Sequence, residues 1–203
     1  MVNSRQLSEQ VATSLGQPLT STLQHAKNLR EAKGASNGPL VTAGGRGRNA
    51  PTMSRTDAAT LICAVLGSEA VQDSVRTIES MRRLKAGSPR SRFWGDHKQT
   101  HLGKPIELGI KDEHDVIDAL ACVLRFFDQE QEFLRDQIFF GTSDPELYAV
   151  FEVEFPHHYA SLTVGVRNMF SETWTYGRRM YPRNEQLRRL RQDAMREISE
   201  VLR

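Results

Sequence analysis

The sequence predicts an α+β fold that is mainly α-helical with small β elements and is divided into two domains. Apolar residues recur at helical spacing over residues 4–32, 54–85, 111–140 and 182–203. Apolar and acidic residues alternate with period two in VFEVEF, residues 150–155, which predicts a β-strand. The basic, turn-rich stretch at residues 85–105 separates the two parts. We therefore expect one domain over residues 1–92 and a second over residues 93–203.

Two helices joined by a short turn are predicted at the N-terminus. Asn3 or Ser4 can cap the first helix, and Gly16 ends it because glycine tolerates the left-handed conformation common at helix ends. Pro18 suits the entrance to the second helix, at about residues 19–33. The apolar stripes are Leu7, Val11 and Leu15 in the first helix and Leu23, Ala26, Leu29 and Ala32 in the second. The other face of the second helix is polar and basic.

A small β-hairpin is expected directly after the second helix, at about residues 39–53. Residues 39–42 (PLVT) and 50–53 (APTM) are the expected strands, and residues 43–49 (AGGRGRN) are the turn. Glycines let a backbone approach phosphates closely, and arginines supply charge and forked donors for them. An arginine can also read the shape of a narrow minor groove. Arg46 and Arg48 at the tip of the turn therefore predict contact with a polyanion.

The run NLREAKG…LVTAGGRGRNAP is similar to the helix-and-wing portion of winged helix-turn-helix transcription regulators. It is also similar to the N-terminal part of prophage-type bacterial proteins with this layout. The resemblance covers residues 4–55, about a quarter of the chain, and implies that the second helix enters the major groove of DNA. Two departures are present: residues 35–38 (ASNG) lengthen the connection to the wing, and the helix that normally precedes the first one is missing unless the next segment supplies it.

DNA contacts are expected from the polar face of the second helix and from the wing. Glutamine and asparagine can bridge two atoms of adenine, and lysine and histidine can contact guanine or phosphate. The residues expected near phosphates or base edges at the helix start are Thr20, Ser21 and Thr22. The expected groove readers are Gln24, His25 and Asn28. Backbone or minor-groove contacts are expected from Lys27, Arg30, Arg46 and Arg48.

Two further helices are predicted before the basic stretch. Ser54 and Asp57 have the spacing of a capping box, and Gly67 ends the helix that they begin. Its apolar stripe is Ala58, Leu61, Ile62, Val65 and Leu66, and that of the next helix is Val71, Val75, Ile78 and Met81. The basic residues that end the second of these helices are Arg82, Arg83 and Lys85. They leave two explanations open: interaction with the helix dipole or contact with the DNA backbone.

The second half combines a short strand, long helices and a hairpin. IELGI, residues 106–110, is an expected strand, and residues 111–140 read as one long helix or two in succession. Residues 148–166 are expected to form a β-hairpin with PHH as its turn. Residues 182–203 are expected to form one helix that packs on its own domain or pairs with a second copy.

Charge is distributed unevenly along the chain. Residues 1–53 carry six Lys or Arg against two Asp or Glu, whereas residues 93–175 carry six against fifteen. Basic ends and an acidic middle favour polyanion contact at one end and assembly or regulation in the middle. The N-terminus lacks the apolar core of a signal peptide, and the sequence contains no run of about 18 apolar residues. We expect buried, reduced Cys63 and Cys122 in a cytoplasmic protein with no membrane span.

No catalytic, metal or cofactor site is expected. His157 and His158 stand in the expected turn, and DEHD at residues 112–115 is better placed to favour a helix start than to bind a metal. GGRGRN lacks the Gly-Lys-Ser/Thr end of a phosphate-binding loop and does not match the dinucleotide fingerprint. The histidine- and aspartate-bearing loop at residues 96–101 has no ligand spacing. These absences favour a protein that is not an enzyme.

The sequence favours a dimeric transcription regulator that binds double-stranded DNA. A dimer is expected because one short recognition helix contacts too few base pairs, and two half-sites increase the discrimination. Two alternatives stay open. One is a structural DNA-handling oligomer such as a phage DNA-packaging recognition subunit, and the other is a protein-interaction module that binds an acidic partner. No small-molecule effector is indicated by any residue.

Overall fold

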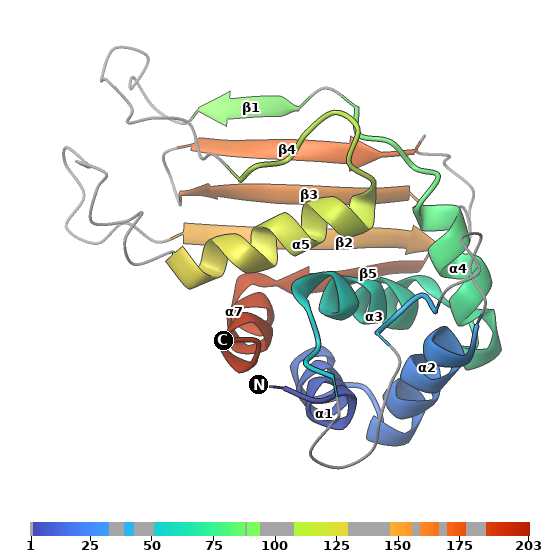
Figure 1. Cartoon of the computed structure of the whole chain (residues 1–203). Helices are drawn as coiled ribbons and strands as arrows, with labels where there is room; N and C mark the ends of the chain where they lie inside the picture. Colours follow the sequence, from blue (N-terminus) through green and yellow to red (C-terminus); the bar gives the residue numbers. More distant parts are fainter. Residues whose placement is uncertain are drawn as a thin grey trace.

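The structure is a computed structural model in which α-helices pack against a mixed-length antiparallel sheet (Figure 1). Helices α3 and α5 lie across one face of the sheet, and α1, α2 and α7 lie beyond its β5 edge. The residues that the structure describes are 2–32, 39–42, 51–87, 89–93, 108–129, 147–155, 159–166, 170–177 and 186–203. The expected α+β class is confirmed.

The helices begin and end where local chemistry favours it. Asn3 forms a capping box with Gln6 at the start of α1, and Gly16 ends this helix with φ 62° in the left-handed region. Ser54 and Asp57 form the expected capping box of α3. Asp115 caps α5 by accepting hydrogen bonds from Ile117 N and Asp118 N. The helices are α1 (Ser4–Leu15), α2 (Leu19–Glu31), α3 (Arg55–Gly67), α4 (Ser74–Met81), α5 (Val116–Phe126) and α7 (Gln192–Val201), with 3-10 turns η2 (Val71–Asp73) and η4 (Phe127–Gln129).

Among the described residues, five antiparallel strands form the sheet in the order β1-β4-β3-β2-β5. Their bounds are β1 (Arg90–Phe93), β2 (Leu147–Phe155), β3 (Tyr159–Val166), β4 (Phe170–Tyr176) and β5 (Gln186–Arg191). Phe151 of β2 lies between Leu162 of β3 and Leu190 of β5, and all three side chains are buried. Because side chains alternate along a strand, this register places one continuous apolar face against the helices.

Helix α3 is the centre of the hydrophobic core. Every residue from Asp57 to Gly67 is buried, so α3 is covered on all sides rather than along the single stripe that the sequence predicts. Its neighbours are α1, α2, α4, α5, β2 and β5. Gly67 allows this close packing, because a Cβ at that position would meet Met81 Cε and lie 2.9 Å from Thr77 Cγ2, so these side chains would have to shift.

Buried residues from both sides of the expected boundary between residues 92 and 93 pack together. One hydrophobic cluster includes Leu61 and Ile62 on one side of that boundary and Leu120 and Phe151 on the other. The boundary itself falls inside β1, which pairs with β4 as an edge strand. Pairing with a distant strand overrides the linker-like composition of this stretch.

Three expectations about elements are wrong. Residues 186–191 form strand β5 rather than the first turns of the C-terminal helix, because they pair with β2 and leave Leu187 41% exposed. Residues 108–110, the described part of the expected IELGI strand, belong to no strand. Residues 39–42 and 51–53 also form no strand, so the expected pairing of the wing strands is absent among the described residues.

Other expectations hold. The hairpin of β2 and β3 is confirmed, and α5 lies within the long helical stretch expected at residues 111–140. Cys63 and Cys122 are buried and free. Over the described ranges, no helix combines the length and the apolar character that crossing a bilayer requires.

Candidate nucleic-acid interface

The N-terminal helices form a two-helix unit backed by a third. Gly16, Gln17 and Pro18 connect α1 to α2, and Gly16 N donates to Thr13 O at 3.1 Å while Gln17 N donates to Ala12 O at 2.9 Å. Helix α3 packs against both α1 and α2. The closed turn fixes the angle at which α2 leaves α1.

An exposed edge runs along α2 on its outer side. The exposed residues of this helix are Thr20, Gln24, Lys27 and Glu31. They recur at intervals of three or four residues, which places them on one face. Ser21, Asn28 and Arg30 flank them and are half-buried. Gln24 Nε2 donates to Asn28 Oδ1 at 2.9 Å, so the amide of Gln24 is already held in one direction.

Two of the predicted DNA-contacting residues do not face outward. Thr22 is fully buried, with Oγ1 3.3 Å from Pro18 O, and His25 is only 5% exposed. The prediction that they lie on the open face of α2 is wrong. The reason is that η2 and α4 pack against this side of α2, which the apolar stripe alone did not indicate.

His25 is held by a hydrogen-bonded cluster between α2 and α4. His25 Nδ1 lies 2.7 Å from Ser74 Oγ, and the Ser74 hydroxyl donates to Val71 O. If the Ser74 hydroxyl donates to Val71 O, this arrangement favours the tautomer in which Nδ1 of His25 is the donor. Asn28 Nδ2 also donates to Val71 O, at 2.9 Å. His25 and Asn28 therefore join α2 to the next segment of the chain, a role that differs from base reading.

The electrostatic surroundings keep His25 neutral. Burial, and then the charge of Arg188, lower the pKa of His25 from 6.5 to about 4. Arg188 belongs to β5, where its Nη1 donates to Val65 O at 3.2 Å, Leu66 O at 3.3 Å and Ser68 O at 2.8 Å. These carbonyls end α3, and a cation at this position is favourable. The sequence predicts a helix over residues 182–203, so this contact of Arg188 was not expected.

The wing expected after α2 lies mainly outside the described residues, and Arg46 and Arg48 are among those left out. On the near side, Leu40 N donates to Leu29 O at 3.0 Å, which fastens the chain to the end of α2. On the far side, Met53 N donates to Val2 O at 2.9 Å. The described flanks of this segment are thus bonded to Leu29 of α2 and to Val2, which precedes α1, rather than to each other as strands.

The basic residues that end α4 contact the beginning of the acidic half. Arg82 Nη1 lies 3.6 Å from Asp115 Oδ2, and Lys85 Nζ donates to Glu113 O at 3.0 Å. The sequence left two explanations open for these cations, the helix dipole and contact with DNA. The contacts within the chain account for the positions of Arg82 and Lys85 without either of them. Both residues connect α4 to the start of α5.

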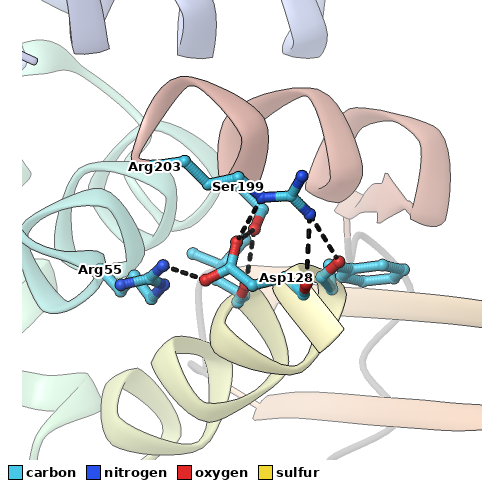
Figure 2. Close-up of polar contacts among 6 residues, drawn as sticks. Arg55, Asp128, Ser199 and Arg203 are labelled. Atoms are coloured by element: carbon cyan, nitrogen blue, oxygen red, sulfur yellow. Dashed lines mark hydrogen bonds and ion pairs between the residues drawn. The ribbon is translucent and has the colours of Figure 1, made fainter. Parts of the chain in front are cut away.

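A second polar cluster, shown in Figure 2, joins three helical segments at Asp128. Arg55 of α3 forms an ion pair with this carboxylate, and Ser199 of α7 donates to it at 2.7 Å. Arg203 contributes a longer ion pair of 3.3 Å and also donates to Phe127 O. Because one carboxylate bonds to Arg55, Ser199 and Arg203, the cluster is suited to fastening α7 across α3 and η4.

Cys122 and His114 approach each other at the start of α5 without forming a reactive pair. Sγ of Cys122 lies 3.9 Å from His114 Nδ1 and 3.7 Å from Gly109 O. Burial raises the pKa of the Cys122 thiol, so the nucleophilic thiolate is disfavoured at neutral pH. Within the described ranges, no set of three or more His, Cys, Asp or Glu side chains is placed to hold a metal ion.

A hollow of about 390 Å³ lies between α1 and the β5–α7 junction. Its cations are Arg189 and Arg191, and its anions are Asp193 and Glu197. Arg189 is paired with Glu152, and Ser14 donates to Glu197 at 2.7 Å. With charges of both signs and internal partners, this hollow selects neither an anionic nor a cationic ligand.

Comparison of the chain with protein-family models, curated proteins and solved structures finds no match.

Proposed function

We propose that this protein binds double-stranded DNA through the exposed edge of α2 and the arginines of the segment that follows it. The observation that carries the proposal is the edge itself, in which Thr20, Gln24 and Lys27 point away from the core on a helix at the periphery of the molecule (Figure 1). Hydroxyl, amide and ammonium groups at helical spacing can contact base edges and phosphates in the major groove. Ser21 and Arg30 extend this edge.

Arg46 and Arg48 supply the second part of the proposed interface. They follow α2 closely in the sequence, and no acidic residue occurs between Ala32 and Ser54. A glycine-rich segment with two arginines suits the sugar-phosphate backbone, where contact depends on charge and close approach rather than on base sequence. The proposed contacts no longer include Thr22, His25 and Asn28, because each of them packs or forms hydrogen bonds inside the protein.

We further propose that the protein is a dimeric transcription regulator. Helix α2 has 13 residues, which is too short to contact more than one half-site. Mass measurement in solution tests this part directly. A dimer supports regulation through paired half-sites, whereas a ring of many subunits contradicts it and agrees with a DNA-packaging component.

Duplex binding at several salt concentrations tests the proposed interface. Each phosphate contact contributes a slope of about 0.9 to the plot of log affinity against log salt. The double variant Arg46→Ala, Arg48→Ala should therefore lose about two units of slope, and Lys27→Ala about one. The matched control is Arg90→Ala, which removes an exposed arginine from β1 at the opposite side of the molecule from α2 (Figure 1).

Two outcomes would contradict the proposal. A loss in Arg90→Ala equal to that in Lys27→Ala, and half that in the Arg46→Ala, Arg48→Ala variant, would mean that only net charge matters, and the proposed interface would be wrong. A wild-type protein that does not bind duplex DNA at low salt would overturn the function as a whole. The protein-interaction alternative would then account for the basic segment.

A further inference from the structure

The carboxylate of Asp57 lies at the base of the segment that carries Arg46 and Arg48. It belongs to the first turn of α3 and is 5% exposed. Thr42 N donates to its Oδ1 at 2.7 Å, and the Thr42 hydroxyl donates to Oδ2 at 2.9 Å. Ser54 N and the Ser54 hydroxyl donate to Oδ2 at 2.7 and 2.8 Å. One buried carboxylate thus accepts four hydrogen bonds from two residues.

These bonds exceed what a helix start needs. A capping box consists of the reciprocal bonds between Ser54 and Asp57, and it is complete without Thr42. Thr42 is 15 residues away in the sequence and lies immediately before the segment 43–53, while Ser54 lies immediately after it. Asp57 therefore bonds to both ends of this segment at once.

Apolar contacts hold the same two ends. Val41 and Met53, which stand next to Thr42 and Ser54, are each only 4% exposed. Met53 N is bonded to Val2 O, and Leu40 N is bonded to Leu29 O. Val41 and Met53 thus lie in the core next to the two residues that bond to Asp57, whose charge strengthens those hydrogen bonds.

We infer that Asp57 is a positioning residue for polyanion binding, because it holds together the two ends of the segment that presents Arg46 and Arg48. This inference rests on the proposed function. Fixing two points of a chain lowers the entropic cost of binding through the residues between them. Asp57 does not touch the ligand in this scheme. It acts through Thr42 and Ser54.

The sign of the effect distinguishes positioning from charge. Asp57 is an acidic group within a basic region, so removing its charge should strengthen polyanion binding if only electrostatics matters. If Asp57 positions the arginines, Asp57→Asn should weaken binding, because an amide lacks the charge and one of the acceptor oxygens. The two explanations predict opposite changes in affinity for the same variant.

Asp115→Asn is the matched control. Asp115 is also 5% exposed, also begins a helix and accepts two backbone hydrogen bonds, and its replacement changes the net charge equally. We expect Asp57→Asn to reduce duplex affinity by about tenfold and to flatten its salt dependence, since fewer phosphates are contacted. Asp115→Asn should bind as the wild type does or slightly tighter. Binding by Asp57→Asn that equals or exceeds that of Asp115→Asn would overturn the inference.

Limited digestion with trypsin gives a readout that does not depend on DNA. Cleavage after Arg46 and Arg48, followed by mass spectrometry, should be faster in Asp57→Asn than in Asp115→Asn at equal thermal stability. Unchanged cleavage overturns the positioning role. If cleavage is faster in Asp57→Asn but the wild type does not bind DNA, the ends are held as inferred and only the proposed function fails.

If Asp57→Asn does not fold, Thr42→Val tests the same inference. This substitution preserves the size of the side chain and the capping box, and it removes only the hydroxyl bond to Asp57. We expect a smaller change in the same direction, with faster cleavage after Arg46 and Arg48 and weaker duplex binding. Wild-type behaviour in both measurements would contradict the inference.

Discussion

At the scale of single residues, buried polar side chains decide how α2 is held. His25 carries an imidazole into the contact between α2 and α4, where it forms a hydrogen bond with Ser74 and has the positive charge of Arg188 nearby. A buried neutral imidazole with one satisfied nitrogen is stable, whereas a charged one beside a guanidinium is not. The proposed DNA-binding helix is therefore joined to the rest of the protein by a group that must stay unprotonated.

Acidification should weaken the fold through His25. The pKa of this residue is about 4 in the folded protein, against its ordinary value of 6.5. Between these values the unfolded chain binds a proton that the folded chain does not, so this contribution is complete above pH 6.5 and is lost as the pH falls toward 4. We expect a loss of at most about 3 kcal/mol in the free energy of unfolding.

Urea unfolding of the wild type and of His25→Gln from pH 7.5 to pH 4 isolates this effect, because other titrating groups are common to both proteins. The wild type should lose more stability than the variant across this range. Parallel profiles would show that His25 is not responsible.

At the scale of elements, the end of α3 depends on a residue from the far end of the chain. Nη1 of Arg188 donates to three carbonyl groups that α3 cannot satisfy itself. Arg188→Met retains most of the aliphatic stem but leaves these buried acceptors without this donor. We expect a loss of about 1–3 kcal/mol in the free energy of unfolding. Arg191→Met, an exposed position on the same strand, is the control and should change stability little in thermal denaturation.

Helices and the central hairpin were predictable because their signals are local. Gly16 and the Ser54–Asp57 pair mark helix ends through bonds that span a few residues, and VFEVEF shows the alternation of a half-buried strand. Strand β5 was not predictable in this way. Leu187 and Leu190 have helical spacing, and only pairing with β2 makes the segment a strand. In β4, Trp174 and Tyr176 alternate with threonines, but Glu172 on the same face interrupts the pattern.

The candidate site was predictable to a similar extent. Helical spacing located α2 and its polar side chains, and the exposed edge retains Thr20, Gln24 and Lys27. Which polar side chains are buried depends on α4, a separate helix whose contact with α2 has no local signal. The bond from Thr42 to Asp57 likewise joins residues far apart in sequence. Tertiary contacts of this kind decide the difference between an outward polar residue and an inward one.

At the scale of the whole molecule, the helices that bear the proposed interface share a core with the sheet. Helix α3 contacts α1 and α2 on one side and α5 and β2 on the other, and α7 contacts both α1 and β2. The cluster at Asp128 fastens α7 to α3 and η4 (Figure 2). A destabilising substitution in the core of the second half should therefore also destabilise the N-terminal helices.

Leu120→Ala tests this coupling. Leu120 of α5 is fully buried, and its truncation should cost about 2–5 kcal/mol. In site-resolved hydrogen exchange, the amides of Val11 in α1 and Leu162 in β3 should lose protection by similar amounts, because one cooperative unit opens as a whole. Full protection of Val11 in this variant would mean that α1 and α2 unfold as a separate unit. If both amides lose protection, the N-terminal helices and the sheet unfold together. A ligand bound to α2 would then also stabilise the sheet against unfolding, and a partner bound to the sheet would stabilise α2.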